Sequence, residues 1–205
     1  MALSRNSTMF SLHGSREASV CLAKGGPIMD TVEAIRTRRS IRSYSPRPVE
    51  RELIEGVIWD AAQAPPPFSG QLPWTFNVIQ GSERISSYGD EALRYARDNH
   101  PDEPGWEWTD RPGFQVFWGA PALIIISGRV EDCCRAGQNL MLSAHARGLG
   151  TCWVGSPMLW LRTASAKAKL RIPADLTPVS VLCLGYPAVI PQTPPRKRPT
   201  IIWLD

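Results

Sequence analysis

Two short apolar runs constrain the fold of this chain more than any other feature of its sequence. Residues 122–127 read ALIIIS and residues 179–185 read VSVLCLG. Because neither run alternates between apolar and polar residues, each is predicted to be a central strand that is buried on both faces. Helical and strand-like patterns alternate along the rest of the 205-residue chain, which predicts a mixed α and β fold in one domain with its own core.

Caps, turns and periodicity predict the remaining elements. A first helix is expected to open at Asp30, because this N-cap and Glu33 form a capping-box arrangement. Apolar residues at helical spacing predict a second helix over about residues 50–63, which the prolines that follow it end. Further expectations, in chain order, are a strand at 75–80, a helix from a Ser82 cap to about 97, a helix from an Asp132 cap to about 147, a helix between Pro157 and Pro173, and a strand-like end at 200–204.

Charge and motif content exclude several classes of function. The net charge is +4, but no zinc-finger, helix-turn-helix or RNP pattern accompanies it, so no nucleic-acid partner is expected. No apolar run reaches about 18 residues, so no membrane span is expected. The sequence has no GxSxG motif, which argues against a serine nucleophile of that type, and no HExxH or other metal-ligand motif, which argues against a bound metal. No GxGxxG follows the first strand, which argues against a Rossmann dinucleotide site. His145 is expected to cap or pack rather than to catalyse.

The cysteines favour a reducing compartment. The chain has five, an odd number, and no CxxC spacing, which argues against a disulfide framework or a zinc site. Cys134, Cys152 and Cys183 stand in apolar contexts and are expected to be buried. A cytoplasmic location is therefore expected.

The first 28 residues differ from the rest of the chain. Residues 1–28 are rich in Ser, carry scattered Arg and Lys, and contain no apolar stretch long enough for a signal peptide. Their composition faintly resembles a transit peptide, but the readings that we favour are an extension outside the domain or a translation start at Met29. The domain itself is assigned to residues 29–205.

An arginine-rich stretch is a candidate anion site. Residues 37–44 read TRRSIRSY. The forked donors of arginine fit a phosphate, and Arg38, Ser40 and Arg42 would share one side of a compact segment. The alternative is a solvated helix end, where arginine complements the helix dipole. A second group of cations, PPRKRP at 194–199, would flank the same ligand if the two ends of the chain meet.

Two loops add features of a ligand site. The segment APPPFSGQLPW at 64–74 is stiffened by proline and carries polar groups, while GLGTCWVG at 148–155 has glycines that allow a ligand to approach the backbone. The alternative for each is a plain turn. The second segment lacks the lysine of a P-loop, so that type of phosphate site is excluded.

In their order and spacing, these motifs resemble the nitroreductase family of flavin enzymes. The resemblance covers residues 29–205 and is carried by AIRTRRSIRSY, the APPPFSGQLPW loop, AGQNLMLSAHARGLGTCWVG, VLCLGYP and the terminal RKRP. It implies an α+β fold in which helices flank a central, mostly antiparallel sheet. It also implies an intertwined homodimer that exchanges C-terminal strands and holds two FMN molecules at the subunit interface.

The same resemblance implies the residues that bind FMN. Arg38 and Ser40 would hold the phosphate, with Arg39 in the same run, and Arg42 would reach the pyrimidine edge of the isoalloxazine ring. The late cations that also meet the phosphate are Arg196 and Arg198. The segment whose backbone lies along the flavin, and can donate toward N5, is Trp153, Val154 and Gly155.

The loop at 64–74 departs from the family pattern, which resembles APSxxNxQPW. The asparagine is absent, and Leu72 stands where the glutamine is usual. Ser69 and Gln71 are expected to substitute for these residues from shifted positions, with Pro66 as a further flavin contact.

The activity implied by the resemblance is that of an FMN-dependent oxidoreductase. It would take hydride from NADH or NADPH and reduce a nitroaromatic, a quinone or a similar electron-poor substrate by a ping-pong mechanism. The cofactor would perform the redox step, so no catalytic side chain is expected beyond electrostatic support from Arg42. The Trp-rich loop at 104–118 would shape the pocket, or else form core or dimer contacts. The alternative function is a flavin-binding protein with a storage, regulatory or flavin-cleaving role and no NAD(P)H turnover.

Overall fold

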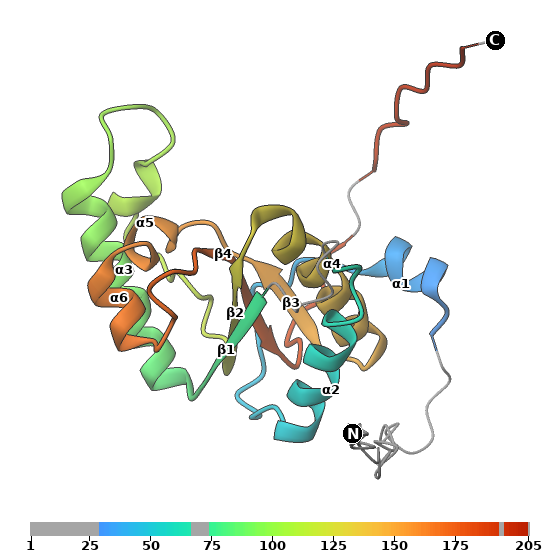
Figure 1. Cartoon of the computed structure of the whole chain (residues 1–205), viewed down its shortest axis with the longest axis horizontal. Coiled ribbons are helices and arrows are strands. Elements are labelled where there is room, and N and C mark those ends of the chain that lie inside the picture. The colour runs from blue at the N-terminus through green and yellow to red at the C-terminus, as the bar shows by residue number, and fades with distance from the viewer. Residues whose placement is uncertain (1–28, 67–73, 193–194, 205) are drawn as a thin grey trace, which may run out of the picture.

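The chain folds around one four-stranded antiparallel sheet (Figure 1). The computed structural model describes residues 29–66, 74–192 and 195–204. Within them the strand order is β1-β2-β4-β3, and every neighbouring pair is antiparallel. The strands are β1 (Trp74–Gln80), β2 (Ala122–Gly128), β3 (Gly150–Trp153) and β4 (Pro178–Gly185). The two apolar runs are therefore the central strands β2 and β4, as predicted.

Helices cover both faces of this sheet, so the expected α+β fold is confirmed. Figure 1 shows α2 and α4 on one side and α3, α5 and α6 on the other. The helices are α1 (Thr31–Thr37), α2 (Arg51–Ala61), α3 (Ser82–Asn99), α4 (Val130–Ala146), α5 (Met158–Leu161) and α6 (Ala164–Lys169), with a 3₁₀ turn η1 at Glu107–Asp110. In the described part of the chain, no helix has the length and apolar character needed to cross a bilayer.

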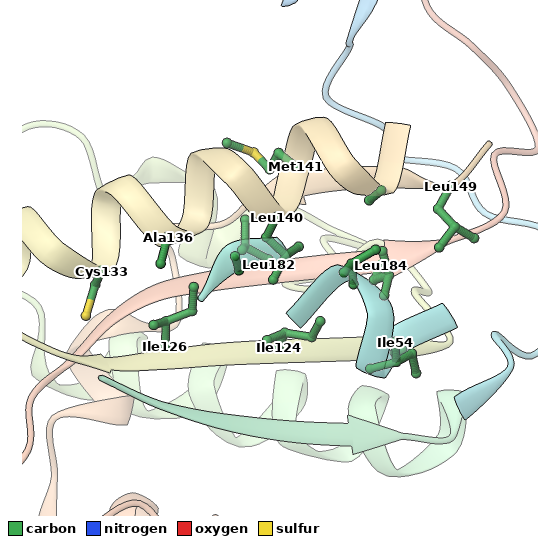
Figure 2. Packing of buried hydrophobic residues seen from close by; sticks show 14 of the residues in the cluster. Ile54, Ile124, Ile126, Cys133, Ala136, Leu140, Met141, Leu149, Leu182 and Leu184 are labelled. Atoms are coloured by element: carbon green, nitrogen blue, oxygen red, sulfur yellow. The ribbon is translucent and has the colours of Figure 1, made fainter. Parts of the chain in front are cut away.

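The side chains of β2 divide between two cores. Ile124 and Ile126 belong to the cluster under α2 and α4, whereas Leu123 and Ile125 belong to the cluster under α3 and α5. Figure 2 shows the first of these clusters, in which Leu140 and other residues of α4 point down onto β2 and β4. Each fully buried aliphatic side chain of this kind contributes about 1.5–3 kcal/mol relative to an exposed one. This burial on both faces explains why neither central strand alternates in sequence.

Several expected helix ends differ from the structure. Asp30 does cap α1, because its Oδ1 accepts from the backbone N–H groups of Val32 and Glu33 at 2.8 and 3.0 Å. The expected caps Ser82 and Asp132 are wrong, since both lie inside their helices, in the first turns of α3 and α4. The cap of α3 is instead Gly81, whose φ of 105° turns the chain into the helix without a side-chain bond.

The helix expected between Pro157 and Pro173 is two short helices. Thr163 separates α5 from α6, and its Oγ1 accepts a 3.1 Å hydrogen bond from the N–H of Ala166. This bond satisfies an N–H that a new helix leaves free, so a second helix begins there instead of the first continuing.

Two further expectations concern exposure. Cys152 and Cys183 are buried as predicted, but Cys134 is exposed. It follows the buried Cys133 on α4, and one residue rotates a side chain by about 100° around a helix axis. The strand-like end at 200–204 forms no strand among the described residues, and the side chains of Ile201 to Leu204 are 64–95% exposed. Figure 1 shows this segment leading away from the sheet and helices. Residues 1–28 lie outside the described residues.

Candidate cofactor site

The arginine stretch docks against the edge strand β3. Ser40 forms a parallel bridge with Thr151, and the N–H of Ile41 donates to the carbonyl of Thr151 at 2.9 Å. The Ile41 side chain is buried over Gly150, where a Cβ would lie only 2.6 Å from its Cγ1. Glycine is therefore required there for the two backbones to approach. This contact brings together TRRSIRSY and GLGTCWVG, the two segments that the sequence singled out.

Charges from the two ends of the chain act on one another at this edge. Arg38 is the residue that ends α1, and its side chain is half-buried. Burial lowers the pKa of Arg38, and the nearby positive charges of Arg196 and Arg39 lower it further. Arg196 belongs to the C-terminal cluster, so residues from opposite ends of the sequence share one positive region.

Arg38 and Arg196 differ from other arginines of the chain in lacking an acidic partner among the described residues. Arg47 pairs with Glu50 at 2.6 Å and Arg147 with Asp60 at 2.7 Å. Across residues 29–66, 74–192 and 195–204, no carboxylate lies within 4.0 Å of the guanidinium groups of Arg38 or Arg196. Like charges held together at a half-buried position repel one another, and a bound anion would relieve that repulsion.

Arg39 has a different local role from Arg38. Its Nη1 donates to the carbonyl oxygens of Arg36 and Arg38 at 3.0 and 2.7 Å, so the guanidinium folds back onto the end of α1. Carbonyls at a helix end lack partners within the helix and carry partial negative charge, which a guanidinium satisfies. The contacts of Arg39 therefore fit the alternative in which an arginine of this stretch complements the end of a helix.

A cavity of about 170 Å³ opens beside Arg38. Thr37 Oγ1 lies 2.8 Å from Nε2 of His145 at its wall, so His145 packs as the sequence predicted. Burial lowers the pKa of His145, and the charges of Arg38 and Arg39 lower it further. The imidazole therefore stays neutral near pH 7 and adds no further cation. The lining comprises Met29, Thr37, Arg38, Arg39, Ile41, His145, Gly148, Leu149, Gly150, Thr151, Pro187 and Ile190.

Thr151 is a candidate site residue that sequence reasoning missed. Its Oγ1 is buried and has no hydrogen-bond partner among the described residues, although the residue lines the cavity. A buried hydroxyl without a partner is unfavourable unless a ligand or water satisfies it. Together with the guanidinium of Arg38, this donor set fits the phosphate end of a cofactor. No sequence signal marks Thr151 beyond its place in a glycine-rich segment.

The segment after β3 presents a more limited set of donors than expected. The N–H of Val154 donates to the carbonyl of Val181 at 2.9 Å, so it is occupied by the sheet. Gly155 is exposed, and its N–H has no backbone partner within the described residues. The Trp153 ring covers Gly137, where a Cβ would lie 2.7 Å from Cζ3 of the indole. Gly155 is therefore the residue here whose backbone is available to a ligand.

Arg42 occupies a separate position from Arg38. Its guanidinium carbon lies 5.7 Å from the centre of the Trp118 ring. Burial raises the pKa of the Cys152 thiol, and the guanidinium groups of Arg42 and Arg38 oppose that rise, Arg42 also through a hydrogen bond. Cys152 is the β3 residue between Thr151 and Trp153, so Arg42 reaches the same strand as the arginine cluster.

The other expected site residues are less well placed. Pro66 is exposed after the end of α2, and Arg198 is exposed in the tail. Ser69 and Gln71 lie outside the described residues. Trp74, at the end of the proline-rich loop, is the first residue of β1 and is buried, and its Nε1 has no partner among the described groups.

Comparison with known proteins shows what this sequence and this fold are similar to. The nitroreductase family model matches residues 35–186. A Methanothermobacter thermautotrophicus protein, whose name gives NADH dehydrogenase or NAD(P)H nitroreductase as a candidate activity, is 36% identical over 178 residues, which cover 86% of this chain and 87% of the relative. The 4-nitrobenzoate reductase of a Nocardioides species is 28% identical in an alignment of 205 positions that covers 78% of this chain and 82% of that protein.

A solved structure has the same fold. The crystal structure of a Bacteroides fragilis nitroreductase with bound FMN superposes with a TM-score of 0.75 at 20% identity. The superposition covers 86% of this chain and 99% of the other. By the family match and the 36% identical relative, this chain belongs to the nitroreductase family.

Proposed function

We propose that this chain is an FMN-dependent oxidoreductase that takes hydride from NAD(P)H and reduces an electron-poor aromatic substrate. The observation that carries the proposal is the half-buried Arg38, which lines a cavity with Thr151, feels the charge of Arg196, and has no carboxylate partner among the described residues. Family membership supplies the class of reaction. FMN, when bound, supplies the redox chemistry, and the protein supplies binding, orientation and electrostatics.

The cluster at the edge of β3 would bind the phosphate. Arg38 and Arg196 supply charge, while the hydroxyl groups of Ser40 and Thr151 supply neutral donors beside them. Arg39 contributes charge to the same region while it holds the end of α1. Hydrogen bonds to charged groups are typically worth about 1.5–3 kcal/mol, so a few such contacts account for retention of a phosphate ester. Arg198 extends the same basic tail.

Arg42 and Gly155 would face the ring system. A guanidinium near the pyrimidine edge favours negative charge there and so supports the reduced cofactor. The N–H of Gly155 is the donor available to N5, because the N–H of Val154 is already bonded to Val181. No side chain is assigned as an acid or base. Pro66, Ser69 and Gln71 remain the proposed contacts from the proline-rich loop.

We infer that a homodimer completes the site. The cavity of about 170 Å³ is smaller than the roughly 300–1,000 Å³ that ligand pockets usually occupy. One chain therefore provides the phosphate end and a second copy would enclose the rest. The exposed tail residues Ile201, Ile202, Trp203 and Leu204 are apolar, and pairing with a partner's sheet would bury them. C-terminal strand exchange is proposed on this ground.

Nitroaromatic compounds or quinones are the proposed substrates, in ping-pong turnover with the nicotinamide. Four aromatic residues of the loop at 104–118 form a continuous series, Trp106, Trp108, Phe114 and Trp118, with ring centres 5.2–5.9 Å apart. The last ring of this series, that of Trp118, lies beside Arg42. Flat electron-poor rings stack favourably on such a surface. The reduction of 4-nitrobenzoate by a relative supports this class.

The proposal is tested on the purified full-length chain. FMN is titrated into cofactor-free protein, and the complex is then mixed without oxygen with NADH or NADPH while the flavin absorbance is followed. Uptake of FMN with bleaching by a nicotinamide, followed by reoxidation with a nitroaromatic or a quinone, is expected. Failure to bind FMN would overturn the proposal. Binding without bleaching by either nicotinamide would establish the storage or regulatory alternative instead.

A further inference from the structure

Trp118 lies in a backbone conformation that its side chain disfavours. Its φ is 56° and that of Gly119 is 68°. The N–H of Ala120 donates to the carbonyl of Phe117 at 3.0 Å, which closes a tight turn over these two residues. Positive φ at both central positions is typical of a type I′ turn, where Gly, Asn and Asp are preferred. A tryptophan there is strained, and strain of this kind concentrates at functional positions.

The ring of Trp118 is held from two directions. Phe114 meets it edge-on, with centres 5.6 Å apart and planes at 72°. The guanidinium of Arg42 lies over it at 5.7 Å. Phe114 in turn packs against Trp108 at 5.2 Å, so the ring is anchored in the aromatic series rather than free in solvent.

Arg42 depends on this ring because it has few other partners. No carboxylate lies within 4.0 Å of its guanidinium in residues 29–66, 74–192 and 195–204. Arg42 is exposed, and its other effect within the chain is to oppose the rise in the pKa of the Cys152 thiol, which is a weak hydrogen-bond acceptor. A cation over an indole face is attracted to the ring without being neutralised. The arrangement therefore fixes the direction of the arginine and leaves its charge available.

We propose that Trp118 is a positioning residue that holds Arg42 against the flavin ring and thereby raises the affinity for reduced FMN. This inference rests on the proposed FMN function. A carboxylate in place of the indole would orient Arg42 equally well but would cancel the charge that supports the reduced cofactor. On this proposal the strained backbone at Trp118 is retained because it places the indole ring against Arg42.

The first test compares Trp118→Leu with Trp118→Tyr in the full-length protein. Neither replacement is β-branched, so both meet the same backbone constraint, but only tyrosine keeps a π face. Arg42 is exposed, so Trp118→Leu is expected to raise the Kd for FMN by about two- to fivefold, with Trp118→Tyr closer to wild type. The loss should be larger for reduced than for oxidised FMN, and a tenfold difference between them lowers the two-electron midpoint potential by about 30 mV.

Two controls separate positioning from a general packing effect. Trp59→Leu removes an exposed indole on α2 that lies outside this aromatic series, and it should leave the potential unchanged. In an Arg42→Ala background, Trp118→Leu should add no further loss of FMN affinity. An unchanged Kd and potential in Trp118→Leu, or an equal loss with Arg42 absent, would overturn the inference.

A third measurement does not depend on FMN. The side-chain protons of Arg42 should show a ring-current shift in NMR spectra of the cofactor-free protein, and this shift should disappear in Trp118→Leu. Its absence from wild-type protein would disprove the contact even if FMN binds. A wild-type protein that shows the shift but takes up no FMN would overturn the proposed function and, with it, the assigned purpose of Trp118.

Discussion

Ile41 lies so close to Gly150 that a side chain on Gly150 would clash with it. A Cβ on Gly150 would lie 2.6 Å from Cγ1 and 2.9 Å from Cβ of Ile41. This contact and the hydrogen bond from the N–H of Ile41 to the carbonyl of Thr151 hold the arginine stretch against β3. The position of Arg38, Ser40 and Arg42 along the sheet edge therefore depends on the absence of a single methyl group.

Gly150→Ala is expected to destabilise the fold by about 1–3 kcal/mol, in the range of overpacked cores. It should also weaken FMN binding, because relief of the clash moves the arginine stretch away from β3. Urea unfolding and FMN titration measure the two effects. The matched control is Gly56→Ala in α2, where the added Cβ would lie 3.8 Å from the Arg147 side chain, an ordinary van der Waals distance. Because glycine disfavours a helix interior relative to alanine, this change should stabilise the fold by about 0.5–1 kcal/mol. Wild-type stability in Gly150→Ala would contradict the close contact.

Glu50 joins the end of β4 to the start of α2. The hydroxyl of Tyr186 donates to Glu50 Oε2 at 2.6 Å, and Arg47 pairs with Oε1. These bonds, that of Tyr186 first, lower the pKa of Glu50 from 4.5 to about 2. Because the folded-state pKa lies below the unfolded one, the carboxylate stabilises the fold above about pH 4.5, and the effect is lost as the pH falls toward 2.

Glu50→Gln should therefore lower the urea midpoint at pH 7, and its difference from wild type should narrow as the pH is lowered from 4.5 to 2. Glu52→Gln serves as a control, since it removes a carboxylate from the first turn of the same helix. A difference between wild type and Glu50→Gln that stays constant through this window would show that the hydrogen bonds do not favour the ionised carboxyl.

The exposed tail gives a test of the proposed dimer. The Trp203 side chain is 81% exposed in the single chain, so a charge there costs the fold of one chain little. If strand exchange buries it in a partner, Trp203→Glu should convert dimers to monomers and weaken FMN binding. Light scattering after size-exclusion chromatography measures the mass. Trp203→Phe keeps an apolar ring and should remain dimeric. A Trp203→Glu protein of unaltered dimer mass would contradict the exchange of this segment.

The sequence predicted the parts of the fold that depend on local pattern. β2 and β4 are mostly apolar because both faces are covered, and the stripe on α2 follows helical spacing. The exposed Cys134 was missed because a helix face is set by its packing partners, which an apolar neighbourhood in sequence does not reveal. Thr163 was missed as a helix start because its hydroxyl competes locally with the continuation of α5.

The candidate site was predictable only where charge marked it. Clusters at 36–42 and 196–198 predicted that the two ends share a ligand, and the charge of Arg196 does act on Arg38. The buried hydroxyl of Thr151 gave no such signal, because its lack of a partner depends on the tertiary structure. The same is true of Trp118, whose positive φ and contact with Arg42 join distant parts of the chain.

Arg38 and Arg42 should be distinguishable by the ligand that each recognises. If Arg38 binds the phosphate, Arg38→Ala should raise the Kd for FMN by about 10- to 150-fold, the range expected for a charged hydrogen bond. The same change should leave the affinity for riboflavin, which lacks the phosphate, nearly unaltered. Arg42→Ala should instead weaken both ligands by similar factors and lower the midpoint potential, because it acts at the ring.

Titrations of FMN and riboflavin into each variant provide the comparison. Arg51→Ala is the control, because Arg51 is an exposed cation already paired with Glu55 at 2.8 Å, away from the β3 edge. The Kd of Arg51→Ala for both flavins should match that of wild type, which would show that the loss of one positive charge does not by itself weaken flavin binding. Equal losses of FMN and riboflavin in Arg38→Ala would show that this residue does not bind the phosphate, and the assignment of the two arginines would then have to be reversed or abandoned.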